Sequence, residues 1–368
     1  AEVIKIEMPK GGDPVRGFGP QEKGESLRWP SMGRNKTCVT LDLRADEGKK
    51  LFFKLIKDTD IVIENFKPGV IEKWGIGYDK MKEINPKIVL VRISGYGQSG
   101  PYKFKPGFGT SGTAFSGYTA LHGFEGLPPV SPAISLADFA AGLFGFIGGL
   151  SAVSAILNGT ESEGQVVDVS LYESLVRLLD GVIADYSVTG RKQKINYMVK
   201  GVSSPCGTHK TKDGKWIIIV CSTHGTWEKL PPAIGRPELL NDERFLTNEL
   251  RLENDDALME IIDVWAGSVT LQEAWSALDG AGVPASPVYE IDDMVKDPQY
   301  VARQSIQSMA HPLFDKISVP AIHPVFSGTP CQIRSLGKPL GADNEEIYCG
   351  RMGLSADELK SLKEKGVL

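Results

Sequence analysis

Short apolar runs alternate with amphipathic stretches through the first half of the chain. The runs have the length and the β-branched composition of buried strands. Strands that alternate with helices in this way are typical of an α/β domain with a largely parallel sheet. The predicted strands are Val3–Ile6, Cys38–Leu43, Asp60–Glu64, Lys87–Ile93 and Gln165–Val169.

Two amphipathic stretches of this half predict helices. Asp46–Lys57 carries an apolar stripe on one face and lysines on the other. Leu171–Tyr186 repeats the pattern after the last strand, and Ser170 and Glu173 have the spacing of a capping box at its start. Each helix is therefore expected to cover one face of the sheet.

The composition changes near Ser203, where a hairpin is predicted. Gly207–Lys212 and Lys215–Val220 flank the turn Asp213-Gly214, which is a strong hairpin signal. We therefore predict a large α/β domain at 1–200, a smaller α+β domain at 203–300 and a return to the large domain at 301–368. Further helices are expected at Asp255–Trp265, Leu271–Leu278, Asp292–Gln304 and Ala356–Lys365.

Composition and charge narrow the class of partner. The 368 residues are 41% hydrophobic and 24% charged, as in a globular protein large enough for two domains. The net charge of −5 is spread without long runs of one sign, so no basic patch for nucleic acid or a membrane surface is predicted. Small molecules or a second copy of the chain are the expected partners. Five irregularly spaced cysteines indicate a reducing, cytoplasmic environment.

One carboxylate stands at the start of a long uncharged stretch. Phe139–Leu157 contains only apolar residues, Gly and Ser, so Asp138 is expected in the first turn of a buried helix. The helix dipole favours an anion there, and a poorly hydrated carboxylate is a nucleophile towards an activated acyl group. Taken alone, however, Ser135 and Asp138 fit a structural helix cap better.

The uncharged stretch after Asp138 is also long enough for a membrane span. It contains Gly145 and Gly149 in a G-x-x-x-G spacing. Its many Gly, Ala and Ser residues lower its hydrophobicity, and strand and helix patterns resume directly after it. A buried helix packed against close neighbours is therefore the favoured interpretation, and no membrane contact is expected.

Two further motifs resemble cofactor or metal sites. Gly95–Gly100 fits G-x-G-x-x-G, but Pro101 follows it instead of the helix that a dinucleotide site needs. Cys206-x-x-His209 and Cys221-x-x-His224 resemble a zinc set, and counting from the hairpin turn places the two cysteines opposite each other. Because residues three apart on a strand face opposite sides, we predict no metal site, with packed thiols and surface imidazoles instead.

Several motifs in a fixed order resemble the class III CoA-transferases, also called the CaiB/BaiF family. They are "AEVIKIE", "GRNKTCVTLDLR", "DIVIENFKPGVIEKWGI", "ISGYGQSGP", "PAISLADFAAG", "GQVVDVSLYESL" and "DPQYVARQSI". The resemblance covers nearly the whole chain. It implies a Rossmann-like large domain built from both ends of the chain, a smaller α+β middle domain and an interlocked homodimer. It also implies about one more strand and helix before Ala1 that contribute to the coenzyme site.

The resemblance assigns site residues position by position. The catalytic aspartate of the family matches Asp138. Positions that contact CoA match Leu41, Arg44, Asn65 and Lys73, and Lys105 lies one residue from a further one. The cations among them can neutralise CoA phosphates, and Leu41 can pack against adenine. Each of these residues alone would be an ordinary surface cation or core leucine.

The implied activity is transfer of CoA from an acyl-CoA donor to a carboxylic acid acceptor. It would proceed through an aspartyl anhydride and an aspartyl-CoA thioester on Asp138, with no permanently bound cofactor. The alternatives are a racemase of α-methylacyl-CoA and a non-catalytic CoA-binding subunit. Racemases of the family have a His thirty residues before the Asp, where this chain has Phe108, and His122 is displaced by fourteen residues. Because phenylalanine cannot exchange a proton, the transferase is favoured.

Overall fold

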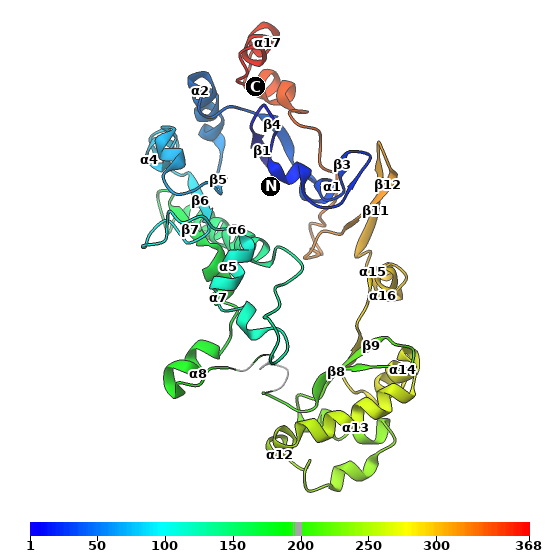
Figure 1. The fold of residues 1–368 in the computed structure, drawn as a ribbon. Helices are drawn as coiled ribbons and strands as arrows, with labels where there is room; N and C mark the ends of the chain where they lie inside the picture. The colour runs from blue at the N-terminus through cyan, green and yellow to red at the C-terminus, as the bar shows by residue number, and fades with distance from the viewer. Residues whose placement is uncertain (194, 196–200) are drawn as a thin grey trace. The chain divides into compact units, whose positions relative to one another are not determined.

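The computed structural model describes residues 1–193, 195 and 201–368. Figure 1 shows the chain as a ribbon. Contacts group the described chain into two compact units. The first unit comprises Ala1–Pro106, Ala141–Ser170 and Asp293–Leu368, and the second comprises Gly107–Ala140 and Leu171–Asp292. Both ends of the chain therefore lie in the same unit. The predicted domain bounds of 1–200, 203–300 and 301–368 stay a prediction.

Parallel strand pairs form the centre of the first unit. β1 pairs with β4, and β5, β6 and β7 form a second sheet with β6 in the middle. A strand lies at each of the five places that the apolar runs predict. The elements of this unit are β1 Ile4–Glu7, β2 Gln21–Glu22, β3 Glu25–Ser26, α1 Trp29–Met32, β4 Thr37–Thr40, α2 Asp46–Leu55, β5 Ile61–Glu64, α3 Val70–Lys73, α4 Tyr78–Ile84, β6 Val89–Ser94, β7 Val166–Ser170, α16 Pro298–Ala302, β11 Ile306–His311, β12 Asp315–Pro320, the π-helix η5 Glu346–Arg351 and α17 Ala356–Glu364.

The apolar face of α2 packs into the core of this unit. Leu51, Phe52 and Leu55 are buried together with Leu90 of β6 and with Tyr348 near the C-terminus. Each buried side chain of this size contributes about 2 kcal/mol relative to an exposed one. The predicted helix over Asp46–Lys57 is confirmed, with its last turn tightened into a 3-10 turn at Ile56–Asp58.

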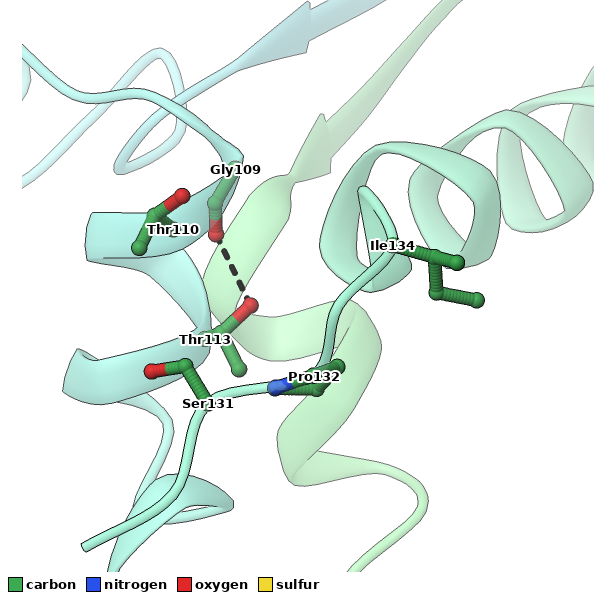
Figure 2. A pocket seen from close by; sticks show the side chains of 6 residues that line it. All are labelled: Gly109, Thr110, Thr113, Ser131, Pro132 and Ile134. Atoms are coloured by element: carbon green, nitrogen blue, oxygen red, sulfur yellow. Dashed lines mark hydrogen bonds between the residues drawn. The ribbon is translucent and has the colours of Figure 1, made fainter.

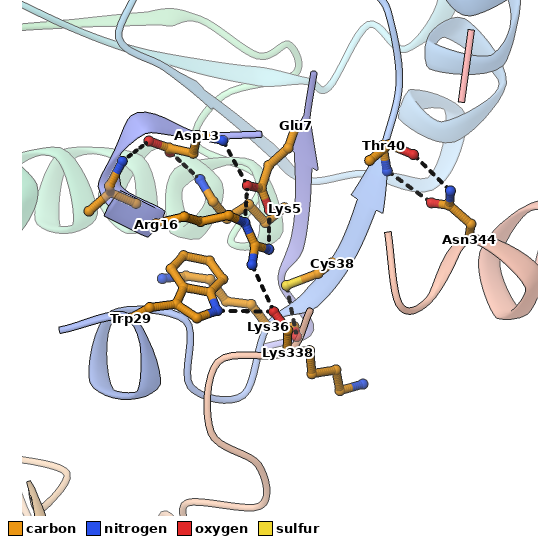
Figure 3. A network of polar contacts seen from close by, with 11 residues as sticks. Lys5, Glu7, Asp13, Arg16, Trp29, Lys36, Cys38, Thr40, Lys338 and Asn344 are labelled. Atoms are coloured by element: carbon orange, nitrogen blue, oxygen red, sulfur yellow. Dashed lines mark hydrogen bonds and ion pairs between the residues drawn. The ribbon is translucent and has the colours of Figure 1, made fainter. Parts of the chain in front are cut away.

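Polar contacts fasten the C-terminal segment to the first strands (Figure 3). Asn344 accepts from the backbone N–H of Thr40 at 2.9 Å and donates to its hydroxyl at 2.7 Å. Arg16 pairs through two nitrogens with the buried Glu7 and donates to the carbonyl of Lys338 at 3.0 Å. Its guanidinium also lies over the ring of Trp29. These contacts explain how residues more than 300 positions apart share one unit.

The helix α6, Leu136–Leu157, is confirmed as one unbroken element, and its glycines rest on the sheet of β5, β6 and β7. A β-carbon on Gly148 would lie 2.7 Å from Cγ1 of Val167, and one on Gly149 would lie 3.0 Å from Cγ2 of Val91. Small residues are therefore needed for this close approach. By length and composition alone, α6 would also pass as a membrane span. A single such helix is weak evidence, because core helices of soluble proteins meet the same criteria.

The prediction that this helix is buried is wrong for one of its faces in the single chain. Its other face exposes large apolar side chains, with exposed fractions between 48 and 65%. Uniform hydrophobicity along the sequence does not reveal which face packs within the chain and which face remains uncovered. We call this face the α6 apolar face, and it consists of Phe139, Leu143, Phe146, Ile147 and Leu150.

The second unit contains a small antiparallel sheet covered by helices, in the strand order β10-β9-β8. Ile217 and Ile219 of β9 pack with Trp227 and Leu258 in its core. A helix lies at the predicted place Leu271–Leu278, where the capping box Thr270–Glu273 opens α14. The elements are α5 Gly109–Phe115, α7 Leu171–Val176, α8 Val182–Thr189, β8 Cys206–Lys210, β9 Trp216–Val220, α10 His224–Trp227, α11 Leu230–Ala233, α12 Asn248–Glu253, α13 Asp255–Ser268, α14 Leu271–Ala281 and β10 Ala285–Pro287, and α15 Ile291–Met294 spans the boundary between the units.

Two stretches that were each predicted as one helix are divided into two helices. The stretch Leu171–Tyr186 is divided into α7 and α8, because Asp180 between them has a φ of 51° that no helix can contain. The stretch Asp292–Gln304 is likewise divided into α15 and α16, with Asp297 capping the second helix ahead of Pro298.

The hairpin of β8 and β9 is present, but its register differs by one residue from the prediction. Cys206 pairs with Val220 rather than with Cys221. The backbone N–H of Thr211 donates to the carbonyl of Lys215, and Gly214 has a φ of 78°. The loop therefore holds three residues with a left-handed glycine, instead of the two-residue turn that we assumed.

Candidate functional site

Asp138 lies in the first turn of α6, as predicted, and it is exposed in the single chain. Its carboxylate lies directly against the α-carbon of Gly109. A β-carbon at position 109 would lie 1.8 Å from Oδ2 and 2.7 Å from Cγ of Asp138. No side chain other than hydrogen fits there, so Gly109 is required by the position of this carboxylate.

Gly109 is the first residue of α5, and local hydrogen bonds fix that helix start. Phe108 has an extended backbone, and its N–H donates to the Ser111 hydroxyl at 2.9 Å, which donates back to the Phe108 carbonyl at 2.8 Å. Gly112 lets α5 approach α7, because a β-carbon there would lie 2.9 Å from Cβ of Leu171. The Asp138 carboxylate thus faces a helix start that is held on two sides.

A small hollow lies beside Gly109 (Figure 2). It encloses about 190 Å³ of space, including its open mouth. Thr113 is buried in its wall and donates to the Gly109 carbonyl at 2.8 Å. Its lining comes from two segments of the second unit and consists of Gly109, Thr110, Thr113, Ser131, Pro132 and Ile134.

Among the five positions matched to CoA contacts, Arg44, Asn65 and Lys105 lie on loops that follow parallel strands. Arg44 follows β4, is exposed, and pairs through two nitrogens with Asp42 at 2.8 and 2.9 Å. Asn65 directly follows β5, and Lys105 lies after β6 with its ammonium 3.6 Å from the centre of the Tyr102 ring. The carboxyl ends of parallel strands are where ligands bind in α/β folds. The fourth, Lys73, is the exposed last residue of α3.

Leu41 differs from the other matched positions. Its side chain is 1% exposed and belongs to the core cluster of the first unit. It packs there as an ordinary core leucine, which the sequence analysis left open as the alternative. Its side chain is therefore not available for packing against adenine in this structure.

Sequence reasoning missed an ion cluster between two of these positions. Arg92 of β6 lies opposite Glu64 of β5, and its Nε donates to Glu64 at 2.6 Å. Its Nη1 and Nη2 donate to Glu72 of α3 at 2.6 and 3.3 Å. Asn65 directly follows Glu64, and Lys73 directly follows Glu72. Arg92 therefore holds both ends of the segment between β5 and α3. A single arginine within the apolar strand V-L-V-R-I-S was the available signal.

Burial and pairing compete in this cluster. Burial raises the pKa of Glu64, although hydrogen bonds from Arg92 and from the Phe66 N–H oppose the rise. Burial lowers the pKa of Arg92, but hydrogen bonds to Glu72 and Glu64 more than offset this effect and raise it. The guanidinium therefore remains charged and holds both carboxylates.

The glycine-rich loop after β6 is a turn and does not open a helix. Pro101–Lys105 forms further turns, and the next helix, α5, begins at Gly109. The Gln98 N–H donates to the Asp168 carboxylate at 2.9 Å, and Gly97 has a φ of 85°. Asp168 thus holds this loop in place.

The thiols and imidazoles of the hairpin region differ in their surroundings. Among residues 1–193, 195 and 201–368, no group of three or more His, Cys, Asp or Glu side chains is placed to hold a metal. Burial raises the pKa of Cys221 to about 12. The expectation of two surface imidazoles is wrong for His209, which is 2% exposed and contacts Asp263 at 2.7 Å through Nδ1, whereas His224 is exposed.

Comparisons with known proteins agree on one family. The model of CoA-transferase family III matches residues 1–344. The chain is 37% identical to the succinyl-CoA–D-citramalate CoA-transferase of Chloroflexus aurantiacus, over all of this chain and 91% of that protein. It is 38% identical to the succinyl-CoA–L-malate CoA-transferase alpha subunit of the same species, over all of this chain and 86% of that subunit.

The fold has solved counterparts as well. A crystal structure of a CaiB/BaiF family protein from Brucella suis superposes with a TM-score of 0.82 at 29% identity, covering 95% of this chain and 91% of that one. Its match confirms the mixed α/β fold with parallel strands and helices. The chain belongs to CoA-transferase family III and is a class III CoA-transferase, an enzyme that uses CoA thioesters as substrates.

Proposed function

We propose that Asp138 is the covalent carrier with which this enzyme moves CoA from an acyl-CoA donor to a carboxylic acid acceptor. The observation that carries the proposal is the contact between the Asp138 carboxylate and Gly109 at the start of α5. The first N–H groups of a helix have no partners within the helix, and they favour negative charge nearby. The same groups would stabilise an oxyanion that forms on the aspartyl or acyl carbonyl.

The reaction proceeds in four acyl transfers. An oxygen of Asp138 attacks the donor thioester carbonyl and expels CoA thiolate, which gives a mixed acyl-aspartyl anhydride. The thiolate attacks Cγ of Asp138 and expels the donor acid, which leaves an aspartyl-CoA thioester. The acceptor carboxylate then attacks Cγ and releases the thiolate, and the thiolate attacks the new acyl carbonyl and frees Asp138. Each step conserves an activated acyl bond, so the chemistry requires no permanently bound cofactor.

The matched residues of the first unit would hold CoA. Arg44, Lys73 and Lys105 supply positive charge for its phosphates, and Asn65 supplies an amide that donates and accepts. Leu41 would contribute through its backbone carbonyl, because its side chain is buried and its N–H donates to the Glu7 carbonyl. Holding CoA matters because the thiolate must remain beside Asp138 between steps.

We further propose that the enzyme is a cytoplasmic, interlocked homodimer with a Rossmann-like large domain built from both chain ends. The α6 apolar face supports this proposal, since a second copy of the chain would cover it. Both Chloroflexus relatives are named for succinyl-CoA, which we propose as a donor for this chain as well. The acids in their names, D-citramalate and L-malate, are short hydroxy acids.

A racemase is not favoured. Phe108 directly precedes Gly109, at the position where racemases of the family carry their histidine, and it offers no proton to exchange. His122 stacks on Tyr118 with ring centres 4.0 Å apart, and its Nδ1 contacts the Tyr118 carbonyl at 2.7 Å. Neither residue supplies the second base that inversion at an α-carbon needs.

A single incubation tests the proposed activity. The protein, succinyl-CoA and isotopically labelled carboxylic acids are combined, and labelled acyl-CoA is detected by mass spectrometry. Transfer of CoA is expected, whereas exchange of the α-proton without transfer would indicate a racemase. Absence of both reactions would indicate a non-catalytic subunit.

Asp138 variants test the covalent step. Asp138→Ala should abolish transfer, and Asp138→Asn should nearly do so, because an amide is a poor nucleophile. Both variants should remain folded, since loss of one cap contact costs about 1 kcal/mol. Hydroxylamine added during turnover should leave a hydroxamate on Asp138. Peptide mapping that finds the mark on Asp168 or Glu173, or on no residue during normal transfer, would refute the assignment.

A further inference from the structure

The hollow beside Gly109 has a lining that is suited to a neutral polar group. Three of its six lining residues carry a hydroxyl, and none of the six is charged. A second carboxylate on the substrate would find no cation among these residues to pair with. A purely apolar group would gain no hydrogen bond from these hydroxyls.

The three hydroxyls are not equivalent. Thr113 is buried and already donates to the Gly109 carbonyl at 2.8 Å. Thr110 and Ser131 are exposed and come from two different segments, α5 and the strand-free loop before α6 (Figure 2). A hydroxyl both donates and accepts hydrogen bonds, so these two residues can donate to a substrate hydroxyl or accept from it. Pro132 and Ile134 supply the apolar part of the lining.

The hollow and the proposed carrier share a residue. Gly109 lines the hollow and also contacts the Asp138 carboxylate. An acyl group on Asp138 would therefore place its first carbons next to the hollow. The hollow is small and open to solvent, so it has room beside the carrier for a small polar group.

We propose that this hollow binds the hydroxyl of a short hydroxy acid, with Thr110 and Ser131 as the residues that select it. In such an acid, the hydroxyl lies on the α-carbon or the β-carbon relative to the reacting carboxyl group. This inference rests on the proposed function of Asp138 as acyl carrier. It assigns the preference for the acceptor acid to two side chains outside the covalent chemistry.

The test compares two acids that differ by one hydroxyl. Succinyl-CoA is the donor. The acceptors are the two enantiomers of malate, tested separately, and labelled succinate. Mass spectrometry follows the exchange of labelled succinate into succinyl-CoA. The measured quantity is the ratio of kcat/KM for the better malate enantiomer to kcat/KM for succinate. Thr110→Val and Ser131→Ala remove one hydroxyl each at exposed positions, and Thr160→Val is the matched control at an exposed threonine outside the hollow.

We expect the wild-type ratio to exceed one by about tenfold or more, since a well-placed hydrogen bond contributes roughly that factor. Thr110→Val and Ser131→Ala should each lower the ratio by about three- to tenfold. Thr160→Val should not change it. A wild-type ratio near one, or an unchanged ratio in both hydroxyl variants, would overturn the inference. Exchange of succinate in the same experiment would still support the transferase activity. Absence of transfer to any acid would instead overturn the proposed function, and this inference with it.

Discussion

The carboxylate of Asp138 and the α-carbon of Gly109 are in direct contact, so that a β-carbon at position 109 would lie 1.8 Å from Oδ2. Gly109→Ala should therefore displace the carboxylate. A displacement of about 1 Å at a reacting group costs on the order of 100-fold in rate. We expect kcat for CoA transfer to fall by about that factor, with little loss in the cooperativity of unfolding.

A matched glycine variant separates this effect from a general loss of stability. Gly267→Ala lies within the helix α13, where a β-carbon would meet no atom of the surrounding structure within 4 Å. It should retain full activity and gain up to about 1 kcal/mol of stability, because alanine favours helix. Full transfer activity in Gly109→Ala would refute the role of this contact.

Arg92 offers a test of the loop that precedes the proposed phosphate contacts. Arg92→Met leaves the buried Glu64 carboxylate without its cation, and we expect a loss of about 3 kcal/mol in the free energy of unfolding. Glu72→Gln should cost less, because the Glu72 side chain is 45% exposed. Urea unfolding measures both changes.

The same variants also report on coenzyme binding. Because Arg92 holds the ends of the segment that carries Asn65 and Lys73, Arg92→Met should weaken CoA binding by about tenfold in calorimetry. Arg244→Met is the control: it removes an exposed pair with Asp242 and should change stability by less than about 1 kcal/mol, with no effect on CoA. Wild-type CoA affinity in folded Arg92→Met would contradict the positioning role.

Local patterns predicted most of the regular structure. The five apolar runs became strands because each is short, β-branched and bounded by turn residues. The hairpin register was off by one residue because the left-handed conformation of Gly214 decides between a two- and a three-residue loop. The split between α7 and α8 at Asp180 was missed for a similar reason, since backbone conformation is not visible in an amphipathic pattern.

The site itself was only partly predictable. Asp138 was placed at a helix start because an uncharged stretch follows it. The family resemblance then identified it as the catalytic position. The contact with Gly109 joins the starts of two helices through the fold, and no spacing in the sequence encodes it. The exposure of the α6 apolar face was missed because an all-apolar helix gives no periodicity to read.

The α6 apolar face predicts the assembly state. Phe146 is 62% exposed at its centre. Phe146→Lys would bury an unpaired charge in the proposed dimer interface, and we expect it to shift the protein to monomer in sedimentation velocity. The sheet-facing side of α6 is unaffected by this change, so the monomer should remain folded. A wild-type protein that is an active monomer at micromolar concentration would contradict the interface.

Cys221 predicts a loss of stability at alkaline pH. Its thiol is fully buried, and burial raises the pKa to about 12 from an ordinary value near 9. The folded state therefore favours the protonated thiol, and the resulting stability is present below about pH 9 and is lost as the pH rises towards 12.

Cys221→Ala should remove this dependence, because alanine does not ionise. Between pH 8 and pH 10.5 the wild type should lose about 2 kcal/mol more free energy of unfolding than the variant, at about 1.4 kcal/mol per pH unit above the ordinary thiol pKa. The methyl side chain will itself cost about 1 kcal/mol at every pH through looser packing. Cys331→Ala is the control, because it removes a thiol at an exposed position. Urea unfolding curves whose difference between wild type and Cys221→Ala stays constant over this range would show that the buried thiol does not control alkaline stability.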